Sequence, residues 1–274
     1  MYEPYKWEFN EEVVECFDKH VRQSVFMYDE FHKSIIKMSK FFIENNTNIL
    51  DVGTSTGELL MKLPYNETCN YIGIDTEESM INKAQEKLEK KYKLQVGNIL
   101  NYKITNCSLI IMMLVLQFIK NKDKQIALRN IYDSLNKGGA FIFVDKIKTP
   151  ILDIHDMYND LYYDFKRDNG LSDTEILDKN ISLRGVQKCL TVDENIQLIK
   201  NVGFKNLDIF FKYYFKAIMP TKLLYFKKIS IFLKPTFFIN CIFSSTVKHF
   251  CTPLKEIFLS SISLSVKPFS LLKS

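Results

Sequence analysis

The chain has 274 residues, 46% of them hydrophobic and 25% charged, which is the composition of a globular protein with one large domain and an appendage. Its six cysteines are scattered, with no Cys-x-x-Cys motif or Cys/His cluster, so neither a zinc site nor a disulfide framework is expected. Of the formal net charge of +5, residues 221–274 carry +7 and the remainder −2, which excludes a main domain that binds nucleic acid through general basicity.

The cellular compartment is suggested by the cysteines and the N-terminus. Scattered cysteines are typical of reduced thiols. Residues 1–5 lack the basic-then-apolar pattern of a secretory signal. We therefore expect a cytoplasmic protein.

The N-terminal part is predicted to be helical. Residues 10–45 have the pattern of two helices, and Phe31, Ile35 and Met38 recur in the second at helical spacing. One face of that helix should belong to a core. We expect residues 1–45 to form a helical cap.

Strands and helices then alternate. Strands are expected near 48–52, 70–75 and 94–96, with an outer helix that starts at Thr76 as its N-cap and runs to about Tyr92. The outer helix is rich in lysine and glutamate, as a solvated helix should be.

The next elements continue this alternation. Residues 107–116 form a continuous apolar run, too short to cross a membrane and typical of a central parallel strand buried on both faces. A helix from Asn121 to about Leu135 should end at Gly138-Gly139, before a strand over 140–145. The alternation predicts an α/β fold with a parallel sheet and helices on both faces.

A helical insertion at about 151–190 interrupts this pattern. Two capping boxes, Ser172–Glu175 and Thr191–Glu194, predict helix starts within and after it. Two aromatic strands, at about 205–212 and 214–219, should bring the sheet to seven strands.

These elements define a predicted domain of residues 46–220, followed by a basic, apolar extension of residues 221–274. The composition of the extension suits contact with an anionic membrane surface. A helical layer packed on the domain, or a poorly ordered end, is the plainer alternative.

One loop carries most of the functional information. The apolar run Ile49–Val52 leads into the loop Gly53–Gly57, and the next apolar run ends in Asp75. Glycines let backbone N–H groups approach a ligand, and a carboxylate that ends the next strand can accept hydrogen bonds from both ribose hydroxyls. The loop reads D-x-G-x-x-x-G, without the pyrophosphate fingerprint G-x-G-x-x-G, so S-adenosylmethionine fits better than NAD. A helix-capping role for Asp75 without any ligand is the alternative.

This loop and the order of elements resemble class I S-adenosylmethionine-dependent methyltransferases, which have a Rossmann-like seven-stranded sheet. Four further segments, in the same order, resemble the carboxy-S-adenosylmethionine synthase (CmoA) family in particular. They are Gln23–Tyr28, Leu116–Ile119, Asn136–Ala140 and Asp164–Ser172. The match covers about Phe9 to Met219, and Asp164–Gly170 is its most specific part.

The resemblance implies an enzyme that uses prephenate to carboxylate the methyl group of S-adenosylmethionine, for later modification of a tRNA wobble uridine. The cofactor would be S-adenosylmethionine or carboxy-S-adenosylmethionine. Tyr28 would close over it, Gly53–Ser55 hold its amino-acid end, Asp75 its ribose, and Asn98 and Ile99 its adenine. The predicted cofactor-binding residues are Tyr28, Asp51, Gly53, Thr54, Ser55, Gly57, Asp75, Thr76, Asn98 and Ile99.

Two residues depart from that family. Met113 stands where the family has a ligand-contacting asparagine, and Asn180 where it has the arginine that pairs with the extra carboxylate. Asparagine cannot replace a charged, bidentate clamp. Arg184, four positions on, would lie on the same helix face and could reach the same point.

Three hypotheses for function follow. The first is methyl transfer to a small-molecule acceptor, for which an enzyme mainly aligns the acceptor and excludes water. The second is synthesis of the carboxylated cofactor, and the third is an inactive cofactor-binding subunit recruited by its extension.

The candidate catalytic residues are His155, as a general base, and Arg184. A purely structural role is the alternative for His155. The charges of Asp164, Lys166 and Arg167 belong either to a solvated helical patch or to the substrate side of the site.

The expected partner is a small-molecule substrate, without direct nucleic-acid binding by the main domain or a bound metal. A homodimer, and a peripheral contact of residues 221–274 with a membrane or a protein, are further expectations that the sequence leaves open.

Overall fold

The computed structural model describes residues 11–212, 214 and 216–221 of the chain. The predicted C-terminal extension therefore lies outside the described residues, apart from Thr221. Within the described ranges, no helix is both long enough and apolar enough to cross a membrane.

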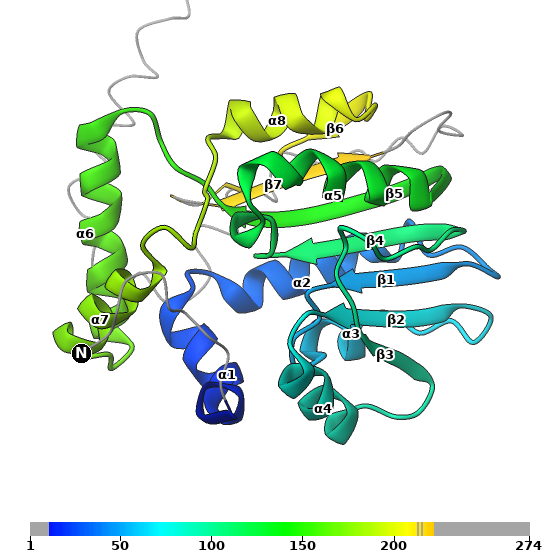
Figure 1. The fold of residues 1–274 in the computed structure, drawn as a ribbon, viewed down its shortest axis with the longest axis horizontal. Coiled ribbons are helices and arrows are strands. Elements are labelled where there is room, and N and C mark those ends of the chain that lie inside the picture. Colours follow the sequence, from blue (N-terminus) through cyan, green and yellow to red (C-terminus); the bar gives the residue numbers. More distant parts are fainter. Residues whose placement is uncertain (1–10, 213, 215, 222–274) are drawn as a thin grey trace, which may run out of the picture. The chain divides into compact units, whose positions relative to one another are not determined.

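A seven-stranded sheet organises this part of the chain (Figure 1). Its order is β3-β2-β1-β4-β5-β7-β6. The five strands from β3 to β5 are parallel, whereas β7 pairs antiparallel with both β5 and β6. The strands are β1 (Asn48–Val52), β2 (Asn70–Asp75), β3 (Tyr92–Val96), β4 (Cys107–Met113), β5 (Leu135–Lys146), β6 (Asn206–Asp208) and β7 (Lys216–Thr221). The predicted α/β fold is confirmed.

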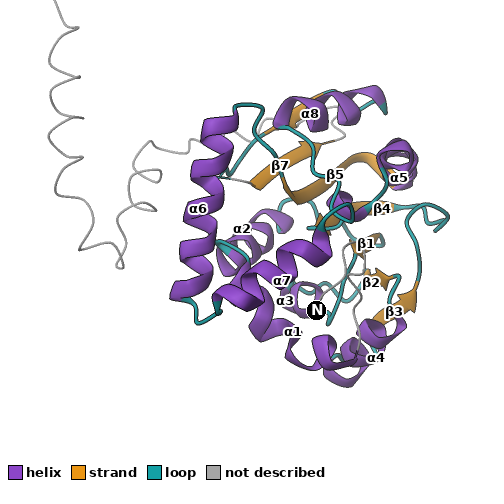
Figure 2. Ribbon diagram, turned by 60° about the vertical axis from the view of Figure 1, so that its left-hand side comes forward, coloured by secondary structure: helices purple, strands orange, loops and turns teal. Residues whose placement is uncertain are grey.

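Helices flank the strands on both sides, as Figure 2 shows. They are α1 (Glu11–Ser24), α2 (Tyr28–Ser39), α3 (Glu58–Lys62), α4 (Glu78–Lys87), α5 (Asn121–Ser134), α6 (Leu152–Asp168), α7 (Asp173–Leu183), α8 (Val192–Asn201) and the 3-10 helix η1 (Leu116–Phe118). The two N-terminal helices are present as predicted, and α6 and α7 fill the expected insertion. Both predicted capping boxes also form, at the starts of α7 and α8.

Strand β4 explains why a central parallel strand has no polar face. Ile110 and Met112 belong to a core that includes residues of α5 and α8, whereas Leu109 and Ile111 belong to a second core with residues of α2 and α3. Because side chains alternate between the faces of a strand, a strand covered on both sides must be apolar at every position.

Two helix boundaries differ from prediction. The N-cap of α4 is Glu77 rather than Thr76, whose hydroxyl donates to the Glu77 carboxylate at 3.3 Å instead of accepting from an amide of the helix. Helix α4 also ends at Lys87, since Tyr92 begins β3.

Gly138-Gly139 does not end a helix. Helix α5 ends at Ser134, and both glycines lie inside β5. A Cβ at Gly139 would come within 2.9 Å of the Cys107 carbonyl oxygen, so this glycine permits β5 to approach the start of β4 closely.

The two-sided core makes a direct prediction about stability. Ile110→Ala should lower the free energy of unfolding by about 2–5 kcal/mol, because it leaves a cavity beneath α5 and α8. Urea denaturation followed by circular dichroism measures the change. Ile126→Ala is the matched control: this isoleucine is half-exposed on α5, so its loss should cost no more than about 0.5 kcal/mol. Equal losses for the two variants would contradict the proposed burial.

Candidate functional site

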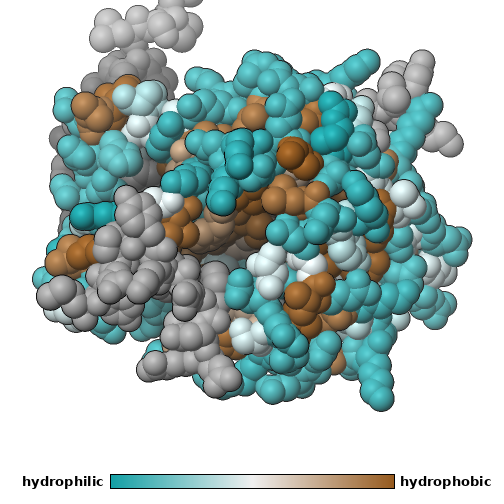
Figure 3. All heavy atoms as spheres, viewed as in Figure 1, coloured by the Kyte–Doolittle hydropathy of each residue, from teal (hydrophilic) through white to brown (hydrophobic). Residues whose placement is uncertain are grey.

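A cavity of about 880 Å³ lies at the carboxyl ends of the parallel strands. Residues that end β1, β2, β4 and β5 line it, and α1, α6 and α7 contribute the facing wall. Figure 1 shows these three helices beyond the strand ends, and Figure 3 shows the hollow with hydrophobic side chains inside a hydrophilic rim. Strand order reverses between β1 and β4, and open parallel sheets bind ligands at such a point.

The glycine loop is tied to the neighbouring strand. The amides of Gly53 and Thr54 both donate to the Ile74 carbonyl oxygen, at 2.8 and 3.0 Å. Gly53 has φ +71°, and a Cβ there would lie 2.2 Å from a methyl group of Val115. Only glycine satisfies both the conformation and the space. The loop is therefore held in one conformation at the edge of the cavity.

Asp75 lies at the edge of the cavity with its carboxylate oriented by backbone. One carboxylate oxygen accepts from the Ser55 amide and the other from the Glu77 amide, each at 3.0 Å. Burial raises the pKa of Asp75, while these amide bonds oppose that shift. Because each carboxylate oxygen can accept two hydrogen bonds, both keep capacity for a further donor, such as a hydroxyl pair.

Asp51, at the end of β1, is a second buried carboxylate of the cavity wall. It accepts from the Thr54 hydroxyl at 2.8 Å, which holds the loop. Burial raises the pKa of Asp51 to about 7; the Thr54 bond opposes the shift and Asp75 adds to it. A cationic ligand in the cavity would favour its ionised form.

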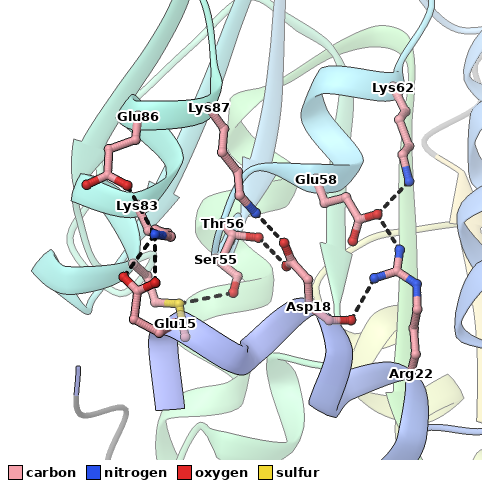
Figure 4. A network of polar contacts seen from close by, with 11 residues as sticks. Glu15, Asp18, Arg22, Ser55, Thr56, Glu58, Lys62, Lys83, Glu86 and Lys87 are labelled. Carbon is pink, nitrogen blue, oxygen red and sulfur yellow. Dashed lines mark hydrogen bonds and ion pairs between the residues drawn. The ribbon is translucent and has the colours of Figure 1, made fainter. Parts of the chain in front are cut away.

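Helix α1 is fastened over this end of the sheet by polar contacts (Figure 4). Asp18 accepts from the Thr56 hydroxyl at 2.6 Å and pairs with Lys87 of α4. Arg22 pairs with Glu58 of α3. Although burial alone would raise it, the bonds from Lys87 and Thr56 hold the pKa of Asp18 below its usual range. These contacts fix the wall that α1 contributes.

Nine of the ten predicted cofactor-binding residues line this cavity, including Tyr28 at the start of α2. The exception is Gly57, which caps α3 with φ +74°, where a Cβ would approach Leu88 at 2.8 Å. Its role is to shape the turn. Asn98 lines the cavity, but its side-chain oxygen Oδ1 already accepts from the Leu100 amide at 3.0 Å, so one lone pair of that oxygen remains for a ligand.

The candidate catalytic residues and the two departures also meet here. His155, Arg184, Met113 and Asn180 all line the cavity. Which of them touches a ligand remains a prediction.

Sequence reasoning missed several basic residues of the same cavity. Lys146 ends β5, Lys179 comes from α7, and His20 from α1. The one available signal was that Lys146 follows the apolar run Ala140–Val144 and Asp145 at the end of a predicted strand. The other two are brought in from distant helices.

Comparisons with known proteins agree with this geometry. Residues 49–139 match the family model described as a methyltransferase domain. The solved structure of human N-acetylserotonin methyltransferase in complex with its S-adenosylmethionine cofactor superimposes with a TM-score of 0.52, at 14% identity, over 77% of this chain and 56% of that chain. That likeness shows the fold.

Two curated relatives are more informative. The carboxy-S-adenosyl-L-methionine synthase of Staphylococcus epidermidis is 39% identical over 216 residues, covering 77% of this chain and 95% of that protein. The protein of the same name from Nautilia profundicola is 33% identical, covering 76% of this chain and 91% of that protein.

The fold and the site define an S-adenosyl-L-methionine-dependent transferase of methyltransferase fold that acts on a small-molecule substrate. More narrowly, the chain belongs to the carboxy-S-adenosyl-L-methionine synthase family. The predicted family, enzyme class and cofactor are thereby confirmed.

The contacts of α1 can be tested by removing one charge. Asp18→Asn leaves Lys87 without its carboxylate, at a cost of about 1–2 kcal/mol, so amides of α1 should exchange about 5–30-fold faster. Hydrogen exchange with mass spectrometry over residues 11–24 measures this. Glu89→Gln, which removes only the exposed pair with Lys91, is the control and should leave α1 unchanged.

The same variant has a predicted pH dependence. Because the folded-state pKa of Asp18 is below its ordinary value of 3.8, its stabilising effect is present above that pH and is lost as pH falls below it. The difference in exchange between the wild type and Asp18→Asn should therefore shrink below about pH 4. A difference that grows in acid would contradict the assignment.

Proposed function

We propose that this chain synthesises carboxy-S-adenosylmethionine from S-adenosylmethionine and a small carboxylate donor such as prephenate. The observation that carries the proposal is the charge of the cavity wall. The wall includes the side chains of Lys146, Lys166 and Lys179, whose positive charge is opposite to that of the carboxylates Asp51 and Asp75. A sulfonium cofactor with a neutral acceptor would gain nothing from three ammonium groups, whereas a carboxylate donor and a carboxylated product would.

The residues of this chain fit the cofactor. Asp75 would accept from the ribose hydroxyls, and the loop residues Gly53, Thr54 and Ser55 would border the amino-acid end. Ile99, which is buried, would border the adenine, and Tyr28 would close the site. When bound, the cofactor supplies a methyl group on a sulfonium centre.

The chain itself orients and shields the reactants. Helix α1 supplies Phe17 and Val21 to the cavity wall, next to Tyr28. Apolar side chains there exclude water, which strengthens every charge interaction inside the cavity. The polar contacts of Asp18 and Arg22 keep this wall in place.

A second candidate, methyl transfer to a small-molecule acceptor, is favoured by the two departures. Met113 is an apolar cavity residue, and Asn180 is neutral and donates to the Tyr163 hydroxyl at 2.9 Å. Neither can supply the contact that the family has at its position. An acceptor that needs no counter-charge would be compatible with both.

We further propose a cytoplasmic location. The described cysteines, Cys16, Cys69, Cys107 and Cys189, are all free, as in a reducing compartment. A product that serves tRNA modification would act through another enzyme, without RNA binding by this domain. A homodimer remains a proposal for the whole chain, and a contact with a membrane or a protein remains a proposal for residues 221–274.

Mass spectrometry of the reaction distinguishes the two candidate functions. With S-adenosylmethionine and prephenate, the proposal expects carboxy-S-adenosylmethionine, and none without prephenate. Accumulation of S-adenosylhomocysteine with a methylated acceptor, and no carboxylated product, would overturn it in favour of methyl transfer.

The role of Asp75 yields a binding prediction. Asp75→Ala should weaken S-adenosylhomocysteine binding about 10–100-fold, because hydrogen bonds to a charged group are each worth about 1.5–3 kcal/mol. Isothermal titration calorimetry measures the affinity. Glu78→Gln, an exposed acidic residue of α4, is the control and should bind like the wild type. Unchanged affinity of Asp75→Ala would remove Asp75 from the cofactor site.

A further inference from the structure

Lys166 of α6 is a buried cation in the wall of the cavity. The residue is only 4% exposed and lines the cavity. Its ammonium lies 4.2 Å from the centroid of the Tyr162 ring and 5.9 Å from that of Tyr163. Among the described residues, the Lys166 ammonium makes no hydrogen bond or ion pair. A buried ammonium is costly unless it is paired, so this position calls for an anion.

The surroundings of Lys166 strengthen that requirement. Lys179 of α7 bonds to the Ser24 hydroxyl at 3.2 Å and to His20 of α1. Lys146 of β5 bonds to the Gln187 side chain at 3.3 Å and lies 5.5 Å from the Tyr162 ring centroid. Three elements thus bring cations to one side of the cavity.

Asn180 lies beside Lys179 in the chain and contacts a residue that neighbours Lys166. Asn180 bonds to the hydroxyl of Tyr163, and the ring of Tyr163 neighbours the Lys166 ammonium. Arg184, the other cation considered for this role, is the C-cap of α7 and is exposed. A solvated charge attracts an anion much more weakly than a buried one.

We propose, resting on the proposed function, that Lys166 binds the carboxylate next to the sulfonium, in place of the arginine absent at Asn180. Lys166 thereby determines specificity for the carboxylated cofactor. It is a binding residue for that group rather than a general base. Lys146 and Lys179 add to the attraction from the neighbouring strand and helix.

Proton uptake should accompany this binding. Burial, together with the charges of Lys179 and Lys146, lowers the pKa of Lys166 to about 7. The remaining neighbours are Tyr162 and Tyr163 of its own helix and His20 of α1, whose pKa burial and Lys179 lower to about 4. A carboxylate raises the pKa of Lys166 and draws a proton, so affinity for the carboxylated ligand falls as pH rises above about 7.

Calorimetric titration of the full chain with carboxy-S-adenosylmethionine and with S-adenosylmethionine tests the proposal. The wild type should prefer the carboxylated form. Lys166→Gln should weaken the binding of carboxy-S-adenosylmethionine about 10–100-fold. It should change the affinity for S-adenosylmethionine by no more than about threefold. Lys166→Arg should restore much of the preference.

Two matched variants serve as comparisons. Arg167→Gln removes the adjacent exposed charge, which is paired with Asp164 and Asp173, and should keep the wild-type preference. Arg184→Gln should also keep it. Loss of the preference in Arg184→Gln, together with its retention in Lys166→Gln, would overturn the proposal.

A second readout is independent of activity. Titrations near pH 7 in two buffers of different protonation enthalpy should show more proton uptake by the wild type than by Lys166→Gln, because the other titratable groups of the cavity are the same in both proteins. Should Lys166→Gln fail to fold, by its near-ultraviolet circular dichroism, Lys166→Met offers an apolar replacement of similar length for the same measurements.

The outcomes separate the two proposals. A wild type that binds both forms equally contradicts the proposed function and the role of Lys166 with it. A wild type that prefers the carboxylated form, with a preference that survives in Lys166→Gln, contradicts the role of Lys166 alone.

Discussion

The hydrogen bond from the Ser55 amide to the Asp75 carboxylate joins the two chain segments on which the site depends. Strands β1 and β2 are parallel neighbours, so the glycine loop after one and the carboxylate that ends the other meet at the same sheet edge. The bonds from Gly53 and Thr54 to Ile74 repeat that connection through backbone alone. A nucleoside can be bound here only while this register holds.

The cavity beyond this edge is divided by charge. Carboxylates lie at the ends of β1 and β2, where a ribose and a cationic sulfonium ligand would be stabilised, and ammonium groups lie at the end of β5 and on α6 and α7. Such a division matches a ligand that carries an adenosyl group at one end and a carboxylate at the other. Helix α1, fastened through Asp18 and Arg22, encloses the space and keeps the local dielectric low.

Met113 and Asn180, the two departures from the family, differ in their expected effect on the charge of the cavity. Met113 exchanges a polar contact for an apolar one, which changes packing more than charge. Asn180 removes a full positive charge from a cavity that would accept a carboxylate. Lys166 and Asn180 lie on neighbouring helices and both contact Tyr163, so α6 supplies a buried cation in the same part of the cavity wall.

Local patterns in the sequence were sufficient to predict the fold and the loop and carboxylate that meet at the cavity. Each of these patterns depends on residues close together in the chain. They are the apolar run of β4, which is buried on both faces, the capping boxes, and the glycine loop with Asp75. Errors arose where a distant contact decided the outcome. Gly139 looked like a helix end, but it is small because β5 must pass close to Cys107.

The residues that α6 and α7 contribute to the cavity could be identified only from the tertiary structure. Asp164, Lys166 and Arg167 are close neighbours on one helix and look alike as a charged patch, yet Arg167 is solvated and paired whereas Lys166 is buried. Nothing in the local sequence separates them, because burial depends on which helix face meets α1 and α7. The sequence alone predicted a pocket for an adenosyl group at the edge of the sheet, because that pattern is local. Only the folded chain decided that lysines of β5, α6 and α7 face the same pocket, because these elements are far apart in the sequence.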